Sequence, residues 1–259
     1  MGEALDHPVF ITCRDRVTAL RALVRWLEGA GCTRIHLVDN QSTYPPLLDY
    51  YAATPHTVIR LRDNLGHRAA WESGAVREHA AGEHYVVTDD DIVPVDDCPL
   101  DAIEHFRVLL DRNPDRAKVG FGLRIDDLPR RYRFSRQVRR WESQFWETAV
   151  EPGVFDAPID TTFALHRPGT DFRRGEPPPH HALSLRTGPP YVARHMGWYV
   201  DSRHLDEEER YYRAHARADV THWNVDRLPQ RLIEGLSTAG RLVDDRPLWR
   251  RVLSRGRRG

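Results

Sequence analysis

The sequence predicts an α/β domain built around a mostly parallel β-sheet. Over residues 8–115, short apolar segments that suit buried strands alternate with amphipathic segments that suit helices. Polar residues follow each apolar segment, as they do where parallel strands end at a ligand-binding edge. The composition, with 40% hydrophobic and 29% charged residues, is that of a globular protein, and 259 residues suffice for one large domain.

In the first half, strands are expected at 9–13, 34–38, 58–61 and 85–87, and helices at 16–28, 67–79 and 99–111. The first helix shows the clearest pattern, because its apolar residues repeat at helical spacing on one face. Gly29 and Gly31 then offer a stop to that helix.

The second half is less regular. Strands are expected at 119–125 and 159–165, and helices at 135–150 and 205–217. The proline-rich stretch 168–190 is expected to be a mobile loop or a lid. We expect a single catalytic domain at 1–235, with halves 8–115 and 116–235, followed by a basic tail at 236–259.

Charge and cysteine content exclude several classes. Lys+Arg and Asp+Glu both number 38, so no global field favours a nucleic-acid partner. All basic side chains except Lys118 are arginines. Three cysteines without a C-x-x-C pair imply no disulfide framework, and the start of the chain lacks the pattern of a signal peptide. No run reaches the length of a membrane span, so a cytoplasmic location is expected.

The segment 85–94, YVVTDDDIVP, runs from an apolar strand directly into three carboxylates. Three adjacent like charges repel one another, and a hard divalent cation is the partner that carboxylates suit best. The alternative is a solvated acidic loop. Polar clusters at 14–16, 39–43 and 63–64 end the other strands, and their convergence on one edge of the sheet would make a site. Polar loops are common, which is the alternative for these as well.

In order along the chain come DNQST at 39–43, the N-x-G of Asn64 and Gly66 before a helix, and the Asp cluster. This order resembles the nucleotide-sugar glycosyltransferases of the GT-A fold, nearest to glycosyltransferase family 2. The resemblance covers 8–100 well and 115–225 loosely, and it rests on the order and spacing of short motifs. It implies a GT-A (Rossmann-like) fold with an irregular C-terminal acceptor region. It also implies sugar transfer from a nucleoside-diphosphate sugar to a hydroxyl acceptor, with inversion expected by analogy.

The resemblance assigns the donor-binding residues. Thr12, Arg14 and Asp39 would hold the nucleoside, although Asp39 could instead form a local turn with the residues that follow it. Residues 64–74 fit the family pattern N-x-G-x-x-x-A-x-N-x-G, except that Glu72 stands where Asn is usual, so Glu72 receives no role. Asn64 belongs to this donor segment. Arg68, in the first turn of the expected helix, would meet the diphosphate, or would be an ordinary solvated arginine.

In the family's DxD motif, one Asp contacts the ribose and the last binds Mn²⁺ or Mg²⁺, which bridges the diphosphate. Asp89 and Asp91 are the preferred pair, and Asp90 stays open as a donor or metal contact. GT-A enzymes often add a histidine ligand near the end of the domain. His222 is the best-placed candidate and His195 the second, while a structural histidine is the alternative for each.

An inverting transferase needs a carboxylate base beside the acceptor hydroxyl. Asp160, at the start of the apolar stretch 159–165, is the first choice, and Asp201 is the reserve. A turn residue is the alternative for Asp160. His195 and Trp198 are expected to face the acceptor, because sugar rings pack on aromatic faces, although core packing explains most of the aromatic residues.

The donor is expected to be of the UDP, GDP or dTDP type, and the acceptor a saccharide, a lipid-linked or a small molecule. The arginine-rich segment 246–259 could contact anionic lipid, or be a solvated end. Two rival functions stay open. Asp89 to Val93 also fits the D-x-D-x-[TV] motif of haloacid-dehalogenase-like phosphatases, with Lys118 as the required lysine. The other rival is a non-catalytic module that binds nucleotide sugars.

Overall fold

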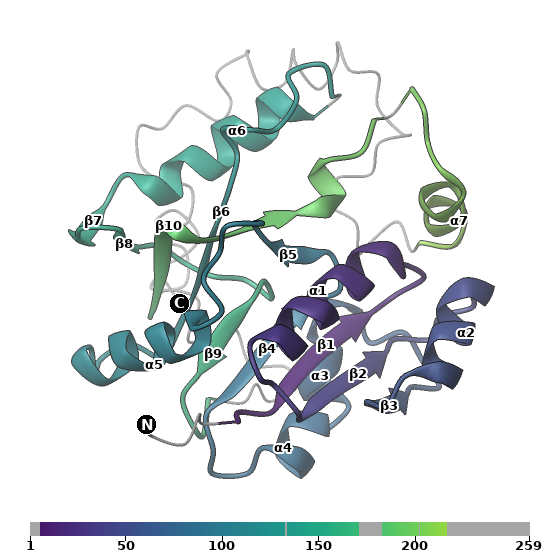
Figure 1. Cartoon of the computed structure of the whole chain (residues 1–259), viewed down its shortest axis with the longest axis horizontal. Coiled ribbons are helices and arrows are strands. Elements are labelled where there is room, and N and C mark those ends of the chain that lie inside the picture. The colour runs from purple at the N-terminus through teal and green to yellow at the C-terminus, as the bar shows by residue number, and fades with distance from the viewer. Residues whose placement is uncertain (1–5, 133, 171–182, 202, 217–259) are drawn as a thin grey trace, which may run out of the picture.

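One large β-sheet with helices on both faces organises the protein (Figure 1). The computed structural model describes residues 6–132, 134–170, 183–201 and 203–216. The strands run in the order β3-β2-β1-β4-β9-β6-β10-β8-β7, and β5 pairs with β10. They are β1 (Val9–Cys13), β2 (Ile35–Asp39), β3 (Thr57–Arg60), β4 (Tyr85–Asp89), β5 (Ile92–Pro94), β6 (Lys118–Leu123), β7 (Ala149–Glu151), β8 (Val154–Asp156), β9 (Ala164–His166) and β10 (Ser184–His195).

The sheet changes character along its width. The four strands β3-β2-β1-β4 are all parallel, and the expected strand positions in this half are confirmed to within a few residues. Beyond β4, strand β9 is antiparallel to both β4 and β6, whereas β6 and β10 are parallel. The α/β class with a mostly parallel core and a less regular second half is therefore as predicted.

Helices cover both faces of this sheet. They are α1 (Thr18–Gly29), α2 (Pro45–Ala53), α3 (Ala69–Glu72), α4 (Ala75–His79), α5 (Ala102–Arg112), α6 (Ser135–Ser143) and α7 (Glu207–His215), with short 3₁₀ turns η1 (Gly66–Arg68), η2 (Gln144–Trp146) and η3 (Met196–Trp198). None of the helices in the described ranges is long and apolar enough to cross a membrane.

Alternation along the strands builds two cores. Successive strand side chains point to opposite faces, so Val9 and Ile11 of β1 join the core under α1 and α5, whereas Phe10 joins the core under α3 and α4. The larger core continues into the second half through residues such as Phe121 and Phe163. The larger core packs α1 against β5. The loop after β1, which leads into α1, therefore lies beside the Asp cluster.

The single helix expected at 67–79 is wrong. Gly74 has a φ of 85°, in the left-handed region that glycine adopts without strain, and it separates α3 from α4. The helix expected at 135–150 ends at Ser143 and is followed by η2 and β7. The strand expected at 159–165 is also shorter, because only Ala164–His166 pairs as β9.

The proline-rich stretch is corrected as well. Its end, expected to be a loop, forms the twelve-residue strand β10. The pairing of β10 with β6 shifts register between Thr187 and Val192, where Pro189 and Pro190 lie. A bulge tolerates proline because its residues need not donate to the ladder. Residues 171–182 and the expected tail at 236–259 lie outside the described residues.

Candidate functional site

The Asp cluster lies where β4 turns into β5, beside the carboxyl end of β1. Each of its three carboxylates has a different partner. Asp89 accepts a hydrogen bond from the hydroxyl of Thr161 at 2.7 Å, and Asp90 accepts one from the backbone amide of Arg14 at 2.8 Å. The Oδ2 atom of Asp91 lies 3.1 Å from Nη1 of Arg16. The turn therefore directs each of the three carboxylates to a different partner.

Burial makes this cluster electrostatically costly. Asp90 and Asp91 are each only 5% exposed. Burial raises the pKa of Asp89 well above its ordinary value, and the neighbouring Asp91 raises it further. Burial and Asp91 likewise raise the pKa of Asp90, with Arg16 opposing. A cation placed among these groups would relieve both effects.

Arg16 is the cation that the chain itself supplies. Burial alone would lower its pKa, but Asp91, Tyr212 and Glu209 together raise it above the ordinary arginine value. Its guanidinium carbon lies 3.6 Å from the ring centre of Tyr212, and Nη2 lies 3.2 Å from the carboxylate of Glu209. Arg16 thus links the Asp cluster to α7.

Helix α7 lies beyond the arrowheads of β1 and β2 in Figure 1 and is held there by polar contacts. Glu208 accepts hydrogen bonds from the amides of Val17 at 2.8 Å and Thr18 at 3.1 Å, at the start of α1. Helix α1 has no acidic residue in its own first turn and no side-chain cap of its own. A residue 191 positions away in sequence therefore satisfies the free amides at its start.

The loops after β2 and β3 are locked together by Asn40. Its side chain donates to Asn64 at 2.8 Å and to the carbonyl of Gly66 at 3.0 Å, and it accepts from the amide of Leu65 at 2.7 Å. Asn64 is therefore engaged within the N-x-G segment. Arg68 follows on η1 and is half-buried.

Asp39 is fully buried, and both of its oxygens accept hydrogen bonds from the protein. Oδ1 accepts from the amide of Ser42 at 3.1 Å and from the hydroxyl of Tyr51 at 3.2 Å, and Oδ2 accepts from Nε of Arg60 at 2.9 Å. The local turn that was the alternative for Asp39 is present. Contact of Asp39 with a nucleoside stays a prediction.

Among the described histidines, His195 is the one that the fold brings to the Asp cluster. Its Nδ1 lies 3.4 Å from Oδ2 of Asp91, and among the described residues this buried nitrogen has no hydrogen-bond partner. Burial lowers the pKa of His195, with Asp91 opposing, and this favours the neutral ring that a metal ligand requires. The ring of Trp198 stacks on it at 4.7 Å between centroids. Trp198 is itself only 8% exposed, so it supports His195 from behind.

Gly197 permits this close approach. A Cβ atom at this position would lie 2.9 Å from Oδ2 of Asp91 and 3.1 Å from Cε1 of His195. Such a distance to a carboxylate oxygen is too short for an ordinary contact. The amide of Met196 also donates to the carbonyl of Asp91 at 2.7 Å. The turn after β10 is thus fitted closely to the Asp cluster.

Asp160 lies in the irregular segment before β9, beside the cluster. It is exposed, and the next residue, Thr161, donates to Asp89. The charge of Asp160 contributes to the pKa shifts of both Asp89 and His195, which places it near both. The reserve residue Asp201 lies elsewhere, in a turn after η3, with Arg131 and His204 as ion-pair partners.

We tested whether these side chains suit a divalent metal. Asp91 and His195 offer a carboxylate oxygen and an unpartnered neutral imidazole nitrogen side by side. Within the described ranges, no group of three or more His, Cys, Asp or Glu side chains is arranged to hold a metal. Mg²⁺ is often bound through one or two carboxylates together with substrate phosphates, so a site of few protein ligands fits such a cation. His222 lies outside the described residues.

Sequence reasoning named most residues of this edge but missed several contacts. Thr12, the last but one residue of β1, has a buried hydroxyl that lacks a partner among the described residues, and it lies beside Asp89 in the register. Arg16, Asn40 and Thr161 were not singled out. Arg16 stood in a noted polar cluster, and Asn40 in the DNQST motif, but nothing local indicated their partners.

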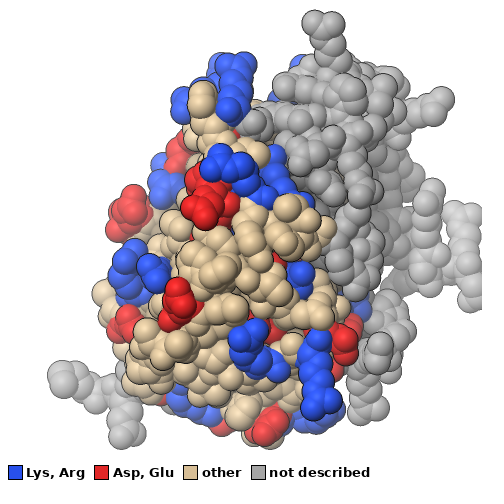
Figure 2. Space-filling view, turned by 90° about the vertical axis from the view of Figure 1, so that its right-hand side faces the viewer, with Lys and Arg blue, Asp and Glu red and all other residues tan. Residues whose placement is uncertain are grey.

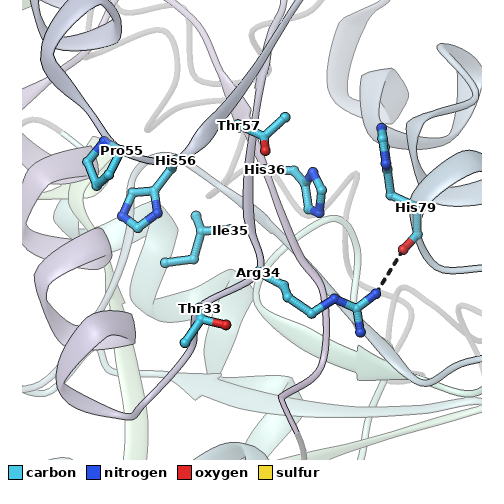
Figure 3. Close-up of a pocket in the computed structure, with 8 residues that line it drawn as sticks. All are labelled: Thr33, Arg34, Ile35, His36, Pro55, His56, Thr57 and His79. Carbon is cyan, nitrogen blue, oxygen red and sulfur yellow. Dashed lines mark hydrogen bonds between the residues drawn. The ribbon is translucent and has the colours of Figure 1, made fainter.

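A separate cavity of about 310 Å³ lies at the opposite, amino edge of the sheet (Figure 3). It is lined by Thr33, Arg34, Ile35, His36, Pro55, His56, Thr57 and His79. Burial lowers the pKa of His36 to about 4, and Arg34 pairs with Glu83, so the cavity presents little free charge. It is not part of the candidate site.

The surface agrees with the balanced composition. Figure 2 shows the side of the molecule on which α2 and α7 lie in Figure 1. On the described part of this side, acidic and basic side chains are interspersed among uncharged ones. No single-sign field large enough to favour a polyanionic partner gathers there.

Comparisons with known proteins leave the family open. No family model matches the sequence, and no curated protein matches it significantly. Among solved structures, mannosyltransferase PcManGT from Pyrobaculum calidifontis, in complex with GDP-Man and Mn²⁺, matches with a TM-score of 0.49 and 15% identity over 80% of this chain and 59% of that chain. The match thus spans less than two thirds of that mannosyltransferase.

Two further solved structures are less similar. A mycobacterial protein has a TM-score of 0.39 and 12% identity over 73% of this chain and 67% of that chain. HddC from Yersinia pseudotuberculosis has a TM-score of 0.36 and 16% identity over 86% of this chain and 85% of that chain. Likeness at this level does not establish an activity.

Proposed function

We propose that the protein is a metal-dependent glycosyltransferase that moves a sugar from a nucleoside-diphosphate sugar to a hydroxyl acceptor. The observation that carries the proposal is the buried Asp cluster at the carboxyl edge of the parallel strands. There Asp91 lies beside the unpartnered nitrogen of His195, and Thr161, the residue after Asp160, donates to Asp89. Ligand sites of open α/β sheets form at this edge.

In this proposal the donor lies across the ends of β1, β2 and β4. Thr12 and Arg14 line the exit of β1, and Asn40 fixes the segment of Asn64 that leads to Arg68. Arg68 at the start of a helix would meet the diphosphate, because both the guanidinium and the helix amides favour anions. A donor of the UDP, GDP or dTDP type is the expected class.

The metal would be held by Asp91 and His195, with Asp89 or Asp90 beside it. When bound, it would offset the negative charge that develops on the departing nucleoside diphosphate. The chain's own residues prepare this place: Trp198 orients the imidazole by stacking, and Gly197 keeps the space next to Asp91 clear. Arg16 neutralises part of the cluster.

Asp160 is the proposed base. Its carboxylate is exposed to the acceptor side while its backbone is fixed from behind, so it can take the proton of an acceptor hydroxyl. Attack from the face opposite the nucleotide gives inversion. The phosphatase alternative receives no support, because Lys118 is fully buried and donates to the carbonyl of Asp160 instead of facing Asp89.

The first experiment is calorimetric titration of the full chain with UDP, GDP, dTDP and CDP, each with and without Mn²⁺. Metal-dependent binding of one diphosphate supports the proposal and selects the donor sugar for a turnover assay. Release of that diphosphate from the sugar donor then separates an enzyme from a non-catalytic binding module. Absence of binding to all four would refute the proposed donor class.

A further inference from the structure

Three buried polar side chains hold the segment that carries Asp160. Ser184 of β10 donates to the carbonyl of Ala157 at 2.9 Å and accepts from the amide of Ile159 at 3.0 Å. Arg186 of β10 donates to the carbonyl of Pro158 at 2.9 Å. Lys118 of β6 donates to the carbonyl of Asp160 itself at 3.0 Å. Four backbone groups of this irregular segment are thereby hydrogen-bonded to side chains of the sheet.

Lys118 is unusual within this group. It is fully buried, and it is the single lysine in a chain whose other basic side chains are all arginine. Lysine can lose its proton when it is buried, whereas arginine stays charged. A group able to lose its proton therefore stands directly behind the proposed base.

The surroundings of Lys118 define its electrostatics. Its neighbours in the sheet register are His166 of β9 and Ser184 of β10. Arg186 adds a like charge nearby, and the carboxylate of Asp160 adds an opposite one. Burial lowers the pKa of Lys118 to about 7, Asp160 opposes this and Arg186 adds to it. A change in the charge of the Asp160 carboxylate will therefore change the fraction of Lys118 that is protonated near neutral pH.

We infer that Lys118 is a positioning residue for Asp160, which fixes the backbone of the proposed base from within the sheet and responds to the charge of its carboxylate. The inference rests on the proposed function for Asp160. Through Thr161, the same segment also holds Asp89. Lys118 thus positions a segment that contacts both the acceptor, through Asp160, and the donor side, through Thr161 and Asp89, without itself touching a substrate.

The sole lysine makes a direct test possible. Protein grown on lysine labelled with ¹³C at Cε gives one ε-CH₂ signal, and its pH titration measures the pKa of Lys118 in the full chain. We expect a midpoint near the value of about 7 in the wild type and a lower midpoint in Asp160→Asn, because the opposing charge is removed. Asp156→Asn, whose carboxylate pairs with Arg116, is the matched control and should leave the midpoint unchanged. A wild-type midpoint near 10, or the same midpoint in Asp160→Asn, would overturn the inference.

Kinetics then test positioning. We expect Lys118→Met to lower kcat roughly 10- to 100-fold with little change in donor KM, as for a slightly misplaced base. The wild-type pH profile of kcat should show an inflection at the pKa measured by NMR, and Lys118→Met should lack it. Val119→Ala, at the adjacent fully buried position, should keep the inflection. Wild-type kcat and an unchanged inflection in Lys118→Met would contradict the inference.

The two proposals fail separately. The NMR titration needs neither a donor nor turnover, and it still decides the inference if Lys118→Met does not fold. Nucleotide titration decides the donor class without reference to Lys118. A lowered midpoint that responds to Asp160, in a protein that binds no nucleoside diphosphate, would keep the link between the two side chains and reject glycosyl transfer.

Discussion

Replacing one partner of the buried pair between Glu142 of α6 and Arg186 of β10 should destabilise the protein strongly. The side chain of Glu142 is 2% exposed and that of Arg186 is 6% exposed, and they form an ion pair. Removing one member of a buried pair leaves the other charge uncompensated, which costs about 3–5 kcal/mol. Glu142→Leu should therefore lower the free energy of unfolding by about that amount.

Arg186→Leu should behave differently, because Arg186 has further contacts and because Glu142 can take up a proton. Arg186 also donates to the carbonyl of Pro158, and its guanidinium lies 4.2 Å from the ring centre of Phe145. Losing the hydrogen bond and the contact with the ring should each lower the free energy of unfolding by about 1 kcal/mol more. Burial already raises the pKa of Glu142, with Arg186 opposing, so removing Arg186 raises it further.

The pH dependence follows from that sign. When a folded-state carboxyl pKa lies above the unfolded one, the folded state holds more protons, and stability falls as pH rises between the two values. The destabilisation by Arg186→Leu should therefore be smaller at pH 5 than at pH 8. Glu142→Leu removes the titrating carboxyl and leaves Arg186, which keeps its charge, so its destabilisation should be no smaller at pH 5 than at pH 8.

Urea unfolding followed by tryptophan fluorescence and circular dichroism, at both pH values, measures these differences. The double variant Glu142→Leu/Arg186→Leu should lose less than the sum of the single variants, by about 1–3 kcal/mol. If the single losses are below about 1 kcal/mol and simply add, the pair does not hold α6 on the sheet, and the reasoning fails.

Four substitutions test the Asp cluster itself. Asp91→Asn should abolish metal-dependent diphosphate binding in calorimetry while leaving the circular dichroism unchanged; normal binding by the folded variant would move the metal contact to Asp90 or elsewhere. Asp90→Asn should keep most of that binding, and equal loss in both variants would contradict distinct roles. His195→Ala should weaken Mn²⁺ binding at least about tenfold, whereas His56→Ala, a control whose ring pairs with a carboxylate at the opposite edge, should not change it. Gly197→Ala should lower stability by about 1–3 kcal/mol in urea unfolding, because its Cβ would press on Asp91, and an unchanged stability would mean that the turn moves freely.

The strand ends could be predicted because the information is local. Runs such as 9–13 and 85–87 are largely apolar, and the polar residues that follow them mark the edge of the sheet without any knowledge of tertiary contacts. Parallel pairing then brings those ends together, as the pairing of β1 with β2 and β4 does. This is why Arg14, Asp39 and Asp89 were placed at one edge from the pattern alone, whereas Thr12 was named only through the family resemblance.

The contacts that complete the site are not local. Glu208 caps α1 from 191 positions away, and nothing in the sequence near either residue indicates that pairing. The chain has 14 histidines, and among those that the structure describes, the fold places His195 beside Asp91. The prolines at 189–190 argued for a loop, but a bulge lets them lie within β10.

The question raised by three adjacent carboxylates has a physical answer in their separate partners. Asp90 is turned toward β1, where the amide of Arg14 binds its oxygen, so its charge is used to fix a loop. Asp89 accepts from Thr161, and Asp91 lies beside both Arg16 and His195. The pairing of Asp89 with Asp91 as the D-x-D motif stays a prediction. Their mutual repulsion, which raises the pKa of Asp89, is then a cost that a bound cation would recover on donor binding.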